Sequence, residues 1–264
     1  MSVQISVVSE QGPCNHMEDY HSFDANFGGK NCIFGGVYDG HSGSGYDGHR
    51  VAEYAAKAIP ETFLKYLSTP QPIHDILQCR DFSHFVTVAF RKSYEEVSAN
   101  GSDLVGACVA NFFIQEKKLL CANVGDSHIM VMNRNKSKLL TIDHRLTNKD
   151  EFKRIVASGG HPDGKYVLSQ DGYNGLIPTR TLGDLRYKSI GVISEPSVIC
   201  HDIQQSDIFL IAGSDGLFDT MNHEEIRALI RTCGTTDEAA TILNQAVWKN
   251  HGNDNLTIMV LKLN

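Results

Sequence analysis

Several features that define other protein classes are missing from this 264-residue sequence. It has no run of about 18 apolar residues, so a membrane-spanning helix is not expected. The first six residues contain no basic stretch, and serine rather than glycine stands at position 2. A secretory signal and N-terminal myristoylation are therefore not expected either. Internal repeats and low-complexity tracts are also absent, which favours an ordinary globular protein.

Paired cysteine motifs are missing too. The seven cysteines are scattered along the chain and contain no CxxC pair. No Cys-x5-Arg segment occurs, which excludes a phosphatase with a cysteine nucleophile. Four cysteines lie within apolar runs, and we interpret them as small buried hydrophobic residues: Cys32, Cys108, Cys121 and Cys200. This usage is typical of a reducing compartment, so we expect the protein in the cytoplasm or the nucleus.

The sequence also lacks an excess of positive charge. Its formal net charge is −7, which argues against nucleic acid as the main partner. An acidic chain suits a protein that gathers carboxylates around cations. Hydrophobic residues make up 41% of the sequence, enough for a sizeable core. No long linker interrupts the pattern, so residues 1–264 are predicted to form a single domain, and we expect a monomer without membrane contacts.

Strand-like segments lie toward both ends of the chain and are joined by short polar turns. They are rich in β-branched, aromatic and aliphatic residues. The predicted strands cover residues 3–9, 31–38, 104–115, 118–124, 128–133, 197–201, 208–212 and 256–263. Connections of about two to five residues favour antiparallel hairpins over parallel β-α-β units.

Amphipathic helices are predicted between the strands. Residues 46–67 and 82–99 carry apolar side chains at helical spacing. A shorter helix is predicted over residues 149–158, with Thr147 as its N-cap. Residues 161–193 are rich in glycine and proline and are interpreted as a surface excursion.

Two further helices are predicted near the C-terminus. Asn222 with Glu225 has the spacing of a capping box, and Thr235 with Glu238 opens the next helix in the same way. Hairpin-rich sheets with helix pairs inserted between them favour an α+β fold. We expect a central antiparallel β-sandwich of two sheets flanked by helix pairs, in α-β-β-α layers.

Acidic residues lie beside predicted strands at four places. These are Glu18-Asp19, Asp39-Gly40-His41, Asp215-Gly216 and Asp254-Asn255. A single Asp-Gly pair more often marks a turn. Here the neighbouring runs are too apolar to be exposed, and several acids meeting there would repel one another without a cation. Because oxygen ligands without a Cys/His set suit hard cations, the site is predicted to bind Mg²⁺ or Mn²⁺.

Seven short segments around these clusters follow one another in a particular order. They are Met17-Glu18-Asp19, Asp39-Gly40-His41-Ser42-Gly43, Gly125-Asp126-Ser127, Asp143-His144, Thr179-Arg180-Thr181-Leu182-Gly183-Asp184, Ser214-Asp215-Gly216-Leu217-Phe218-Asp219 and Asp254-Asn255-Leu256-Thr257. This ordered set resembles the metal-dependent protein phosphatases of the PPM (type 2C) family over nearly the whole chain. The resemblance implies a β-sandwich flanked by helices and the hydrolysis of phosphoserine and phosphothreonine in phosphoprotein substrates.

The resemblance also implies a site for two metal ions, with a third, weakly bound ion in some family members. Asp39 would bridge the two ions, and the Gly40 carbonyl would bind one of them. Asp126 and Asp215 match the positions of the third ion, and Asp126 and Asp184 would border the active-site mouth. The remaining expected metal-binding residues, direct or through water, are Glu18, Asp19, Asp215 and Asp254.

The expected chemistry needs no protein nucleophile. Two cations close together lower the pKa of a shared water, so that a metal-bridged hydroxide attacks phosphorus near neutral pH. His41 follows Asp39 by two residues and is the candidate general acid for the departing serine or threonine oxygen. The alternative is a histidine that supports the metal site or merely lies in a turn.

One position departs from the family pattern. An arginine that holds the substrate phosphate is expected three residues before Met17, and Cys14 stands there instead. A thiol cannot replace the bidentate hydrogen bonds of a guanidinium, so weak substrate binding is expected. His16 or Arg180 is predicted to compensate in part. Ser42, in place of a glycine, is a milder change that a turn accommodates.

Three functions stay open on the sequence. The first is an active serine/threonine phosphatase, which is favoured because the metal-binding clusters are complete. The second is a pseudophosphatase, a binding module with weak or no activity, which the loss of the arginine at Cys14 supports. The third is a metal-dependent hydrolase of another phosphoester.

Overall fold

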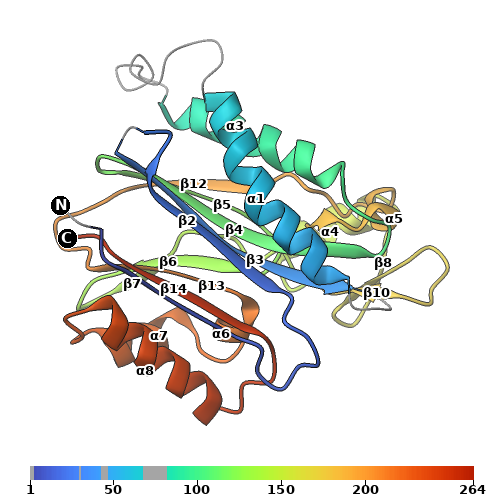
Figure 1. Cartoon of the computed structure of the whole chain (residues 1–264). Helices are drawn as coiled ribbons and strands as arrows, with labels where there is room; N and C mark the ends of the chain where they lie inside the picture. Colours follow the sequence, from blue (N-terminus) through green and yellow to red (C-terminus); the bar gives the residue numbers. More distant parts are fainter. Residues whose placement is uncertain (1–2, 30, 43–46, 68–81) are drawn as a thin grey trace.

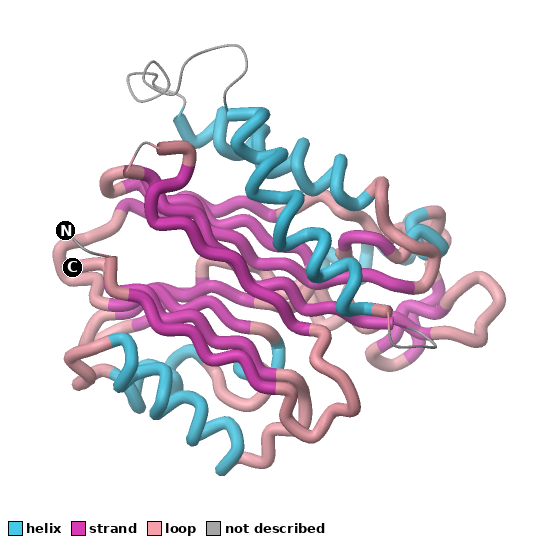
Figure 2. The backbone as a smooth tube through the Cα atoms, in the orientation of Figure 1, coloured by secondary structure: helices cyan, strands magenta, loops and turns pink. Residues whose placement is uncertain are grey.

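The computed structural model of the chain describes residues 3–29, 31–42, 47–67 and 82–264 (Figure 1). Two antiparallel sheets pack face to face, and helices cover their outer faces (Figure 2). The predicted α-β-β-α layers are thereby confirmed. The expectations for Gly43, for the helix start at Tyr46 and for Cys79 fall outside the described residues. None of the described helices combines the length and apolar character that a membrane crossing requires.

The larger sheet has the strand order β12-β5-β4-β3-β2, with β11 paired to β4. Its strands are β2 (Asp19–Phe27), β3 (Cys32–Ser42), β4 (Val105–Gln115), β5 (Lys118–Val124), β11 (Leu182–Gly183) and β12 (Ser197–Asp202). Helices α1 (Gly48–Leu67) and α3 (Phe82–Ser98) lie side by side over its outer face (Figure 1).

The second sheet has the strand order β1-β14-β13-β6-β7. Its strands are β1 (Ile5–Glu10), β6 (His128–Met132), β7 (Ser137–Leu139), β13 (Phe209–Gly213) and β14 (Leu256–Lys262). Helices α7 (His223–Ile230) and α8 (Thr236–Lys249) cover its outer face, and the short α6 (Asp215–Phe218) follows β13 directly (Figure 1).

A small three-stranded sheet projects at one end of the sandwich (Figure 1). It consists of β8 (His161–Asp163), β9 (Tyr166–Leu168) and β10 (Gly175–Leu176), flanked in sequence by α4 (Lys149–Ala157) and α5 (Leu185–Lys188). This region corresponds to the expected surface excursion. It has an apolar cluster of its own, which includes Ile155, Val167 and Tyr187.

Side-chain alternation along β4 shows how the layers are held together. Val109 and Phe113 lie in the cluster beneath α1 and α3, whereas Ala110 and Phe112 lie in the cluster between the two sheets. Successive residues of a strand point to opposite faces, so β4 buries apolar side chains on both sides. This central strand fixes its neighbour β3, which carries Asp39.

The structure corrects two details of the sequence analysis and adds a strand. α4 begins after Asn148, whose side chain accepts a hydrogen bond from the Asp150 amide, so Asn148 rather than Thr147 is the N-cap. Cys200 is exposed rather than buried, because β12 lies at the edge of its sheet. The sequence pattern does not predict β2, since this edge strand carries several exposed polar side chains.

The two C-terminal helices begin as predicted. Asn222 and Glu225 form a reciprocal capping box at the start of α7. The Thr235 hydroxyl accepts a hydrogen bond from the Glu238 amide at the start of α8. Both caps satisfy backbone amides that have no partner within the helix.

Candidate active site

The predicted acidic clusters meet at one end of the sandwich. Asp39 on β3 lies directly opposite Asp19 on β2 in the antiparallel register. Asp215 is the first residue of α6, Asp254 precedes β14, and Asp126 lies in the turn between β5 and β6. The cluster therefore draws on both sheets, which brings together residues from both ends of the chain.

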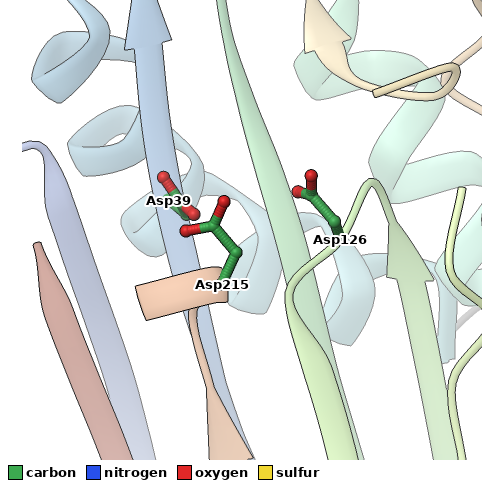
Figure 3. A group of neighbouring side chains, drawn as sticks. All are labelled: Asp39, Asp126 and Asp215. Atoms are coloured by element: carbon green, nitrogen blue, oxygen red, sulfur yellow. The ribbon is translucent and has the colours of Figure 1, made fainter. Parts of the chain in front are cut away.

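Three of these carboxylates converge closely. Side-chain oxygens of Asp39, Asp126 and Asp215 all lie within 4.8 Å of one another (Figure 3). Burial raises the pKa of Asp39 well above its usual range, and the carboxylates of Asp215 and Asp19 raise it further. Burial, Asp126 and Asp254 raise the pKa of Asp215 in the same way. The surrounding carboxylates thus outweigh any positive charge near Asp39 and Asp215.

The backbone approaches closely beside these acids. The Gly40 amide donates a hydrogen bond to the Glu18 carbonyl oxygen at 3.1 Å. A Cβ atom at Gly40 would lie 2.4 Å from the Gly48 carbonyl oxygen and 2.9 Å from the Glu18 carbonyl oxygen. Only glycine fits between β2 and the start of α1, and this contact brings the Glu18 side chain to the site.

The donor atoms show that a divalent cation fits. Glu18 Oε1 is buried and has no hydrogen-bond partner among the described residues. A buried carboxylate oxygen in that state is unfavourable unless an ion or water binds it. Asp19 is 4% exposed, and its pKa is raised to about 6, chiefly by burial. The converging carboxylate oxygens are the ligands that Mg²⁺ and Mn²⁺ prefer.

A cavity of about 310 Å³ opens over the cluster. Its acidic lining consists of Glu18, Asp39, Asp126, Asp184, Asp215 and Asp254. Much of the remaining lining is apolar and includes Leu104, Tyr166, Leu176, Ile177, Pro178 and Tyr187. No lysine or arginine is found among the described residues that line it. A phosphate entering this cavity meets no fixed cation apart from a protonated His41.

His41 lies in the cavity and is held by Asp184. Its Nε2 is 2.7 Å from Asp184 Oδ2, and the Asp184 side chain is only 2% exposed. Burial opposes the imidazolium form, but the Asp184 carboxylate outweighs it and raises the pKa of His41. A Cβ atom at Gly106 would lie 2.0 Å from Asp184 Oδ2, so this buried carboxylate depends on a glycine in β4.

The segment that carries Cys14 lies beside Asp254. The Cys14 thiol donates a hydrogen bond to Asp254 Oδ1 at 3.4 Å. Burial and the Asp254 carboxylate raise the pKa of Cys14 to about 11, so the thiol is neutral. Asn255 fixes the segment, since its Nδ2 donates to the His16 carbonyl oxygen at 2.9 Å. Neither Cys14 nor His16 belongs to the cavity lining.

Arg180 is engaged with Glu151, a buried carboxylate of α4. Its Nη2 donates to Glu151 Oε1 at 2.7 Å, and its Nη1 donates to the Glu195 carbonyl oxygen at 2.9 Å. Burial opposes ionisation of Glu151, but the hydrogen bonds from Arg180 and Arg154 outweigh it and lower the pKa to about 2. These contacts favour a structural role for Arg180, and its contact with phosphate stays a prediction.

Arg145 stands in none of the quoted sequence motifs, yet the structure places it against the acidic cluster. Its guanidinium lies close to the carboxylates of Asp126, Asp215 and Asp219. In the sequence, Arg145 is marked only by its position directly after the family-like segment Asp143-His144. A single arginine beside a turn belongs to no periodic pattern, so the sequence alone does not predict its position in the fold.

Comparison with known proteins decides the family. A sequence model described as protein phosphatase 2C matches residues 3–255. The chain belongs to the protein phosphatase 2C family. Protein phosphatase 1K, mitochondrial, of Xenopus laevis is 31% identical to it over 233 residues, which are 87% of this chain and 60% of that protein. Protein phosphatase 2C homolog 1 of Saccharomyces cerevisiae is 26% identical over 266 residues, and the match covers 94% of this chain and 88% of that protein. This family member thus spans only part of the length of its frog relative.

Solved structures share the fold of this protein phosphatase 2C family member. A serine-threonine phosphatase 2C from Toxoplasma gondii superposes with a TM-score of 0.79 at 17% identity, covering 99% of this chain and 95% of the other. A C. elegans sex determining protein superposes with a TM-score of 0.78 at 23% identity, and the match covers 100% of this chain and 65% of the other. Likeness at this level of identity shows the fold alone.

Proposed function

We propose that this chain is a metal-dependent protein phosphatase that hydrolyses phosphoserine and phosphothreonine. The observation that carries the proposal is the cavity lined by six carboxylates and by no described lysine or arginine. Such a surface repels a phosphate dianion unless divalent cations lie between them. The relatives named as protein phosphatases support phosphoprotein substrates.

We assign two Mg²⁺ or Mn²⁺ ions to the region around Asp39. Its carboxylate is the one most surrounded by others, so it is the natural shared ligand of two ions. The other expected donors are Glu18, Asp19, the Gly40 carbonyl, Asp215 and Asp254. Bound ions would supply activation of water and neutralisation of the phosphate charge.

His41 supplies the proton that the leaving serine or threonine oxygen requires. Asp184 occupies its Nε2, so Nδ1 is the ring nitrogen that remains for that oxygen. The raised pKa of His41 keeps the ring protonated to higher pH. Asp184 is thus a positioning residue, which orients the ring and favours its charged form.

Phosphopeptide hydrolysis with and without metal tests the proposal. We expect no turnover in EDTA and full turnover after Mn²⁺ or Mg²⁺ is added, with phosphoserine and phosphothreonine peptides preferred over small phosphoesters. Full activity in EDTA would show that the ions are not required. No activity at any metal concentration would instead favour the pseudophosphatase.

The role of His41 has a separate test. General acids typically contribute about 10²–10⁴-fold to the rate. His41→Ala should therefore slow phosphoserine peptides by that factor and aryl phosphates much less, because a phenolate leaves without a proton. Asp184→Asn should weaken the same preference to a smaller extent. Equal losses on both substrates would mean that His41 supports the metal site or the fold.

A further inference from the structure

Arg145 contacts the acidic cluster without lining the cavity. Its Nε donates to Asp126 Oδ2 at 2.7 Å, and its Nη1 donates to Asp219 Oδ1 at 2.7 Å. Its Nη2 donates to Asp219 Oδ2 at 3.0 Å and to Asp215 Oδ2 at 3.3 Å. One guanidinium therefore makes four hydrogen bonds to three carboxylates. Charge-assisted pairs of this kind are among the strongest hydrogen bonds in proteins.

The loop that carries Arg145 is fastened to the turn that carries Asp126. The His144 amide donates to the Gly125 carbonyl oxygen at 3.1 Å, and the Gly125 amide donates to His144 Nδ1 at 3.2 Å. Arg145 also forms an isolated β-bridge with Pro178. Its side chain is 21% exposed, and that of Asp126 is 6% exposed. The main chain at Arg145 is thus held by Gly125 on one side and by Pro178 on the other.

Asp126 and Asp39 differ in charge balance, because only Asp126 is bound by the Arg145 guanidinium. Asp126 Oδ2 accepts a hydrogen bond from the Arg145 guanidinium at 2.7 Å, and the Asp126 side chain is only 6% exposed. No described arginine or lysine lies in the cavity lining around Asp39. Asp126 is already neutralised by the protein itself.

A third metal ion at Asp126 and Asp215 does not fit this arrangement. Divalent cations bind through carboxylate lone pairs, and Arg145 already donates to Asp126 Oδ2 and to Asp215 Oδ2, on the side of the cluster where a third ion would bind. An ion placed there would displace the guanidinium or lie beside a like charge. Within the described part of the chain, Arg145 makes no hydrogen bond to the other oxygen of Asp215, whose carboxylate is among those that converge with Asp39.

We propose that Arg145 is a built-in cation that takes the place of a third metal ion, so that this chain binds two ions and no more. The inference rests on the proposed metal-dependent function. It sets aside the expectation that Asp126 holds a weak third ion, and it gives Arg145 the part of holding Asp126 and Asp215 in position.

Counting bound Mn²⁺ on the full chain tests this directly. Isothermal titration calorimetry and electron paramagnetic resonance of free Mn²⁺ both give the number of ions per chain without measuring activity. We expect two ions for the wild type and a third for Arg145→Ala, because Asp126, Asp215 and Asp219 then become free. Arg145→Gln keeps a polar side chain at this position but removes the charge, and it should also gain an ion. This variant replaces Arg145→Ala in the test if the alanine variant does not fold.

Two controls isolate the site. Arg231→Ala removes the same charge from the exposed end of α7 and should leave the count at two. Adding Asp126→Asn to Arg145→Ala should remove the ion that was gained. Three ions in the wild type, no gain in either folded Arg145 variant, or a gained ion that survives Asp126→Asn would overturn the inference. A folded wild type that binds no Mn²⁺ would refute the proposed function instead.

Discussion

Two carboxylates of this molecule, the half-buried Asp39 and the buried Glu151, have pKa values shifted in opposite directions. Asp39 in the cavity is surrounded by other acids, and its pKa is raised well above the usual range by burial and by those neighbours. Glu151 on α4 has a side chain that is 5% exposed, yet it pairs with Arg154 and Arg180 and accepts a hydrogen bond from Thr179. Its pKa is lowered to about 2, because these partners outweigh burial.

The difference shows how a carboxylate that binds something outside the chain can be told from one that serves the fold. Burial acts against the charged form of both residues. Glu151 has its cations within the protein, so it contributes to stability in the absence of any ligand. Asp39 has no arginine or lysine beside it among the described cavity residues, so its charge is balanced only when an ion binds. Substitutions at the two sites should therefore affect different measurements.

The largest expected effect is on activity at Asp39. Asp39→Asn should lower kcat by several orders of magnitude, because the shared metal ligand is lost. In EDTA, however, its unfolding free energy should equal or exceed that of the wild type, since an unbalanced buried charge has been removed. Urea unfolding in EDTA, beside a phosphopeptide assay in Mn²⁺, measures both. If Asp39→Asn were markedly less stable than the wild type in EDTA, Asp39 would serve the fold as Glu151 does.

The reverse pattern is expected at Glu151. Glu151→Gln leaves two arginines without their carboxylate, and breaking a buried pair in this way costs about 3–5 kcal/mol of unfolding free energy. Glu195→Gln is the matched control, because its pair with Arg91 is more than half exposed on both sides. Exposed pairs are worth at most about 1 kcal/mol. Equal urea midpoints for the two variants would refute a structural role for the Glu151 network.

Metal binding should stabilise the fold through the site around Asp39 and not through the Glu151 network. An ion that binds only the native state at about one hundred times its Kd adds about 2.7 kcal/mol to the unfolding free energy. We expect Mn²⁺ to raise the Tm of the wild type and of Glu151→Gln but not that of Asp39→Asn. Differential scanning fluorimetry with and without EDTA is sufficient. A similar rise in Asp39→Asn would place the ions elsewhere.

The pH dependence of the metal-free chain should separate Asp19 from Glu151. The folded-state pKa of Asp19 is about 6, above its ordinary value of 3.8, so the native state binds more protons than the unfolded state between these values. Unfolding free energy should therefore fall as pH rises from about 4 to 6, by at most about 1.4 kcal/mol per pH unit for one proton. The lowered pKa of Glu151 acts oppositely, and its contribution is lost below pH 4.5 toward about 2. Asp19→Asn should reduce the slope between about pH 4 and 6 without removing it, because the pKa values of Asp39, Asp143 and Asp215 are raised as well. An unchanged slope would contradict the raised pKa of Asp19.

The smallest expected effect concerns Cys14. Cys14→Arg adds a guanidinium beside Asp254, where the neutral thiol now lies. One new interaction of about 1.4 kcal/mol with the substrate phosphate gives a tenfold rise in kcat/KM, chiefly through KM. Cys14→Lys tests whether charge without the planar fork is enough. An unchanged KM for both variants would show that position 14 does not face the phosphate.

Much of the fold could be predicted because most strands are buried. β4 and β5 are apolar on both faces, and their turn at Glu116 and Lys117 is polar, so their bounds agree within a residue. β2 escaped prediction because an edge strand half in solvent carries polar residues with no strict alternation. The small sheet escaped because strands of two or three residues give no periodic pattern.

The site residues that stand in short sequence motifs were predictable. The pairings that depend on long-range packing were not. Asp39, Asp215 and Asp254 stand in short motifs beside strands, and the structure brings them together. His41 and Asp184 are 143 positions apart in the sequence, and no local sequence pattern predicts that they pair. Arg145 is similar, since its partners come from the turn after β5 and from α6.

The placement of the first strand has a consequence for how the protein is made. Among the described strands, β1 pairs only with β14, residue by residue from Ile5 opposite Leu261 to Glu10 opposite Leu256. Until β14 is available, β1 lacks its strand partner and β13 has one free edge. Glu18 and Asp19 are synthesised more than 230 residues before Asp254, their neighbour in the folded site. A chain without β14 therefore carries most of the acids of the site but lacks the strand that follows Asp254, so closure of the site depends on β14.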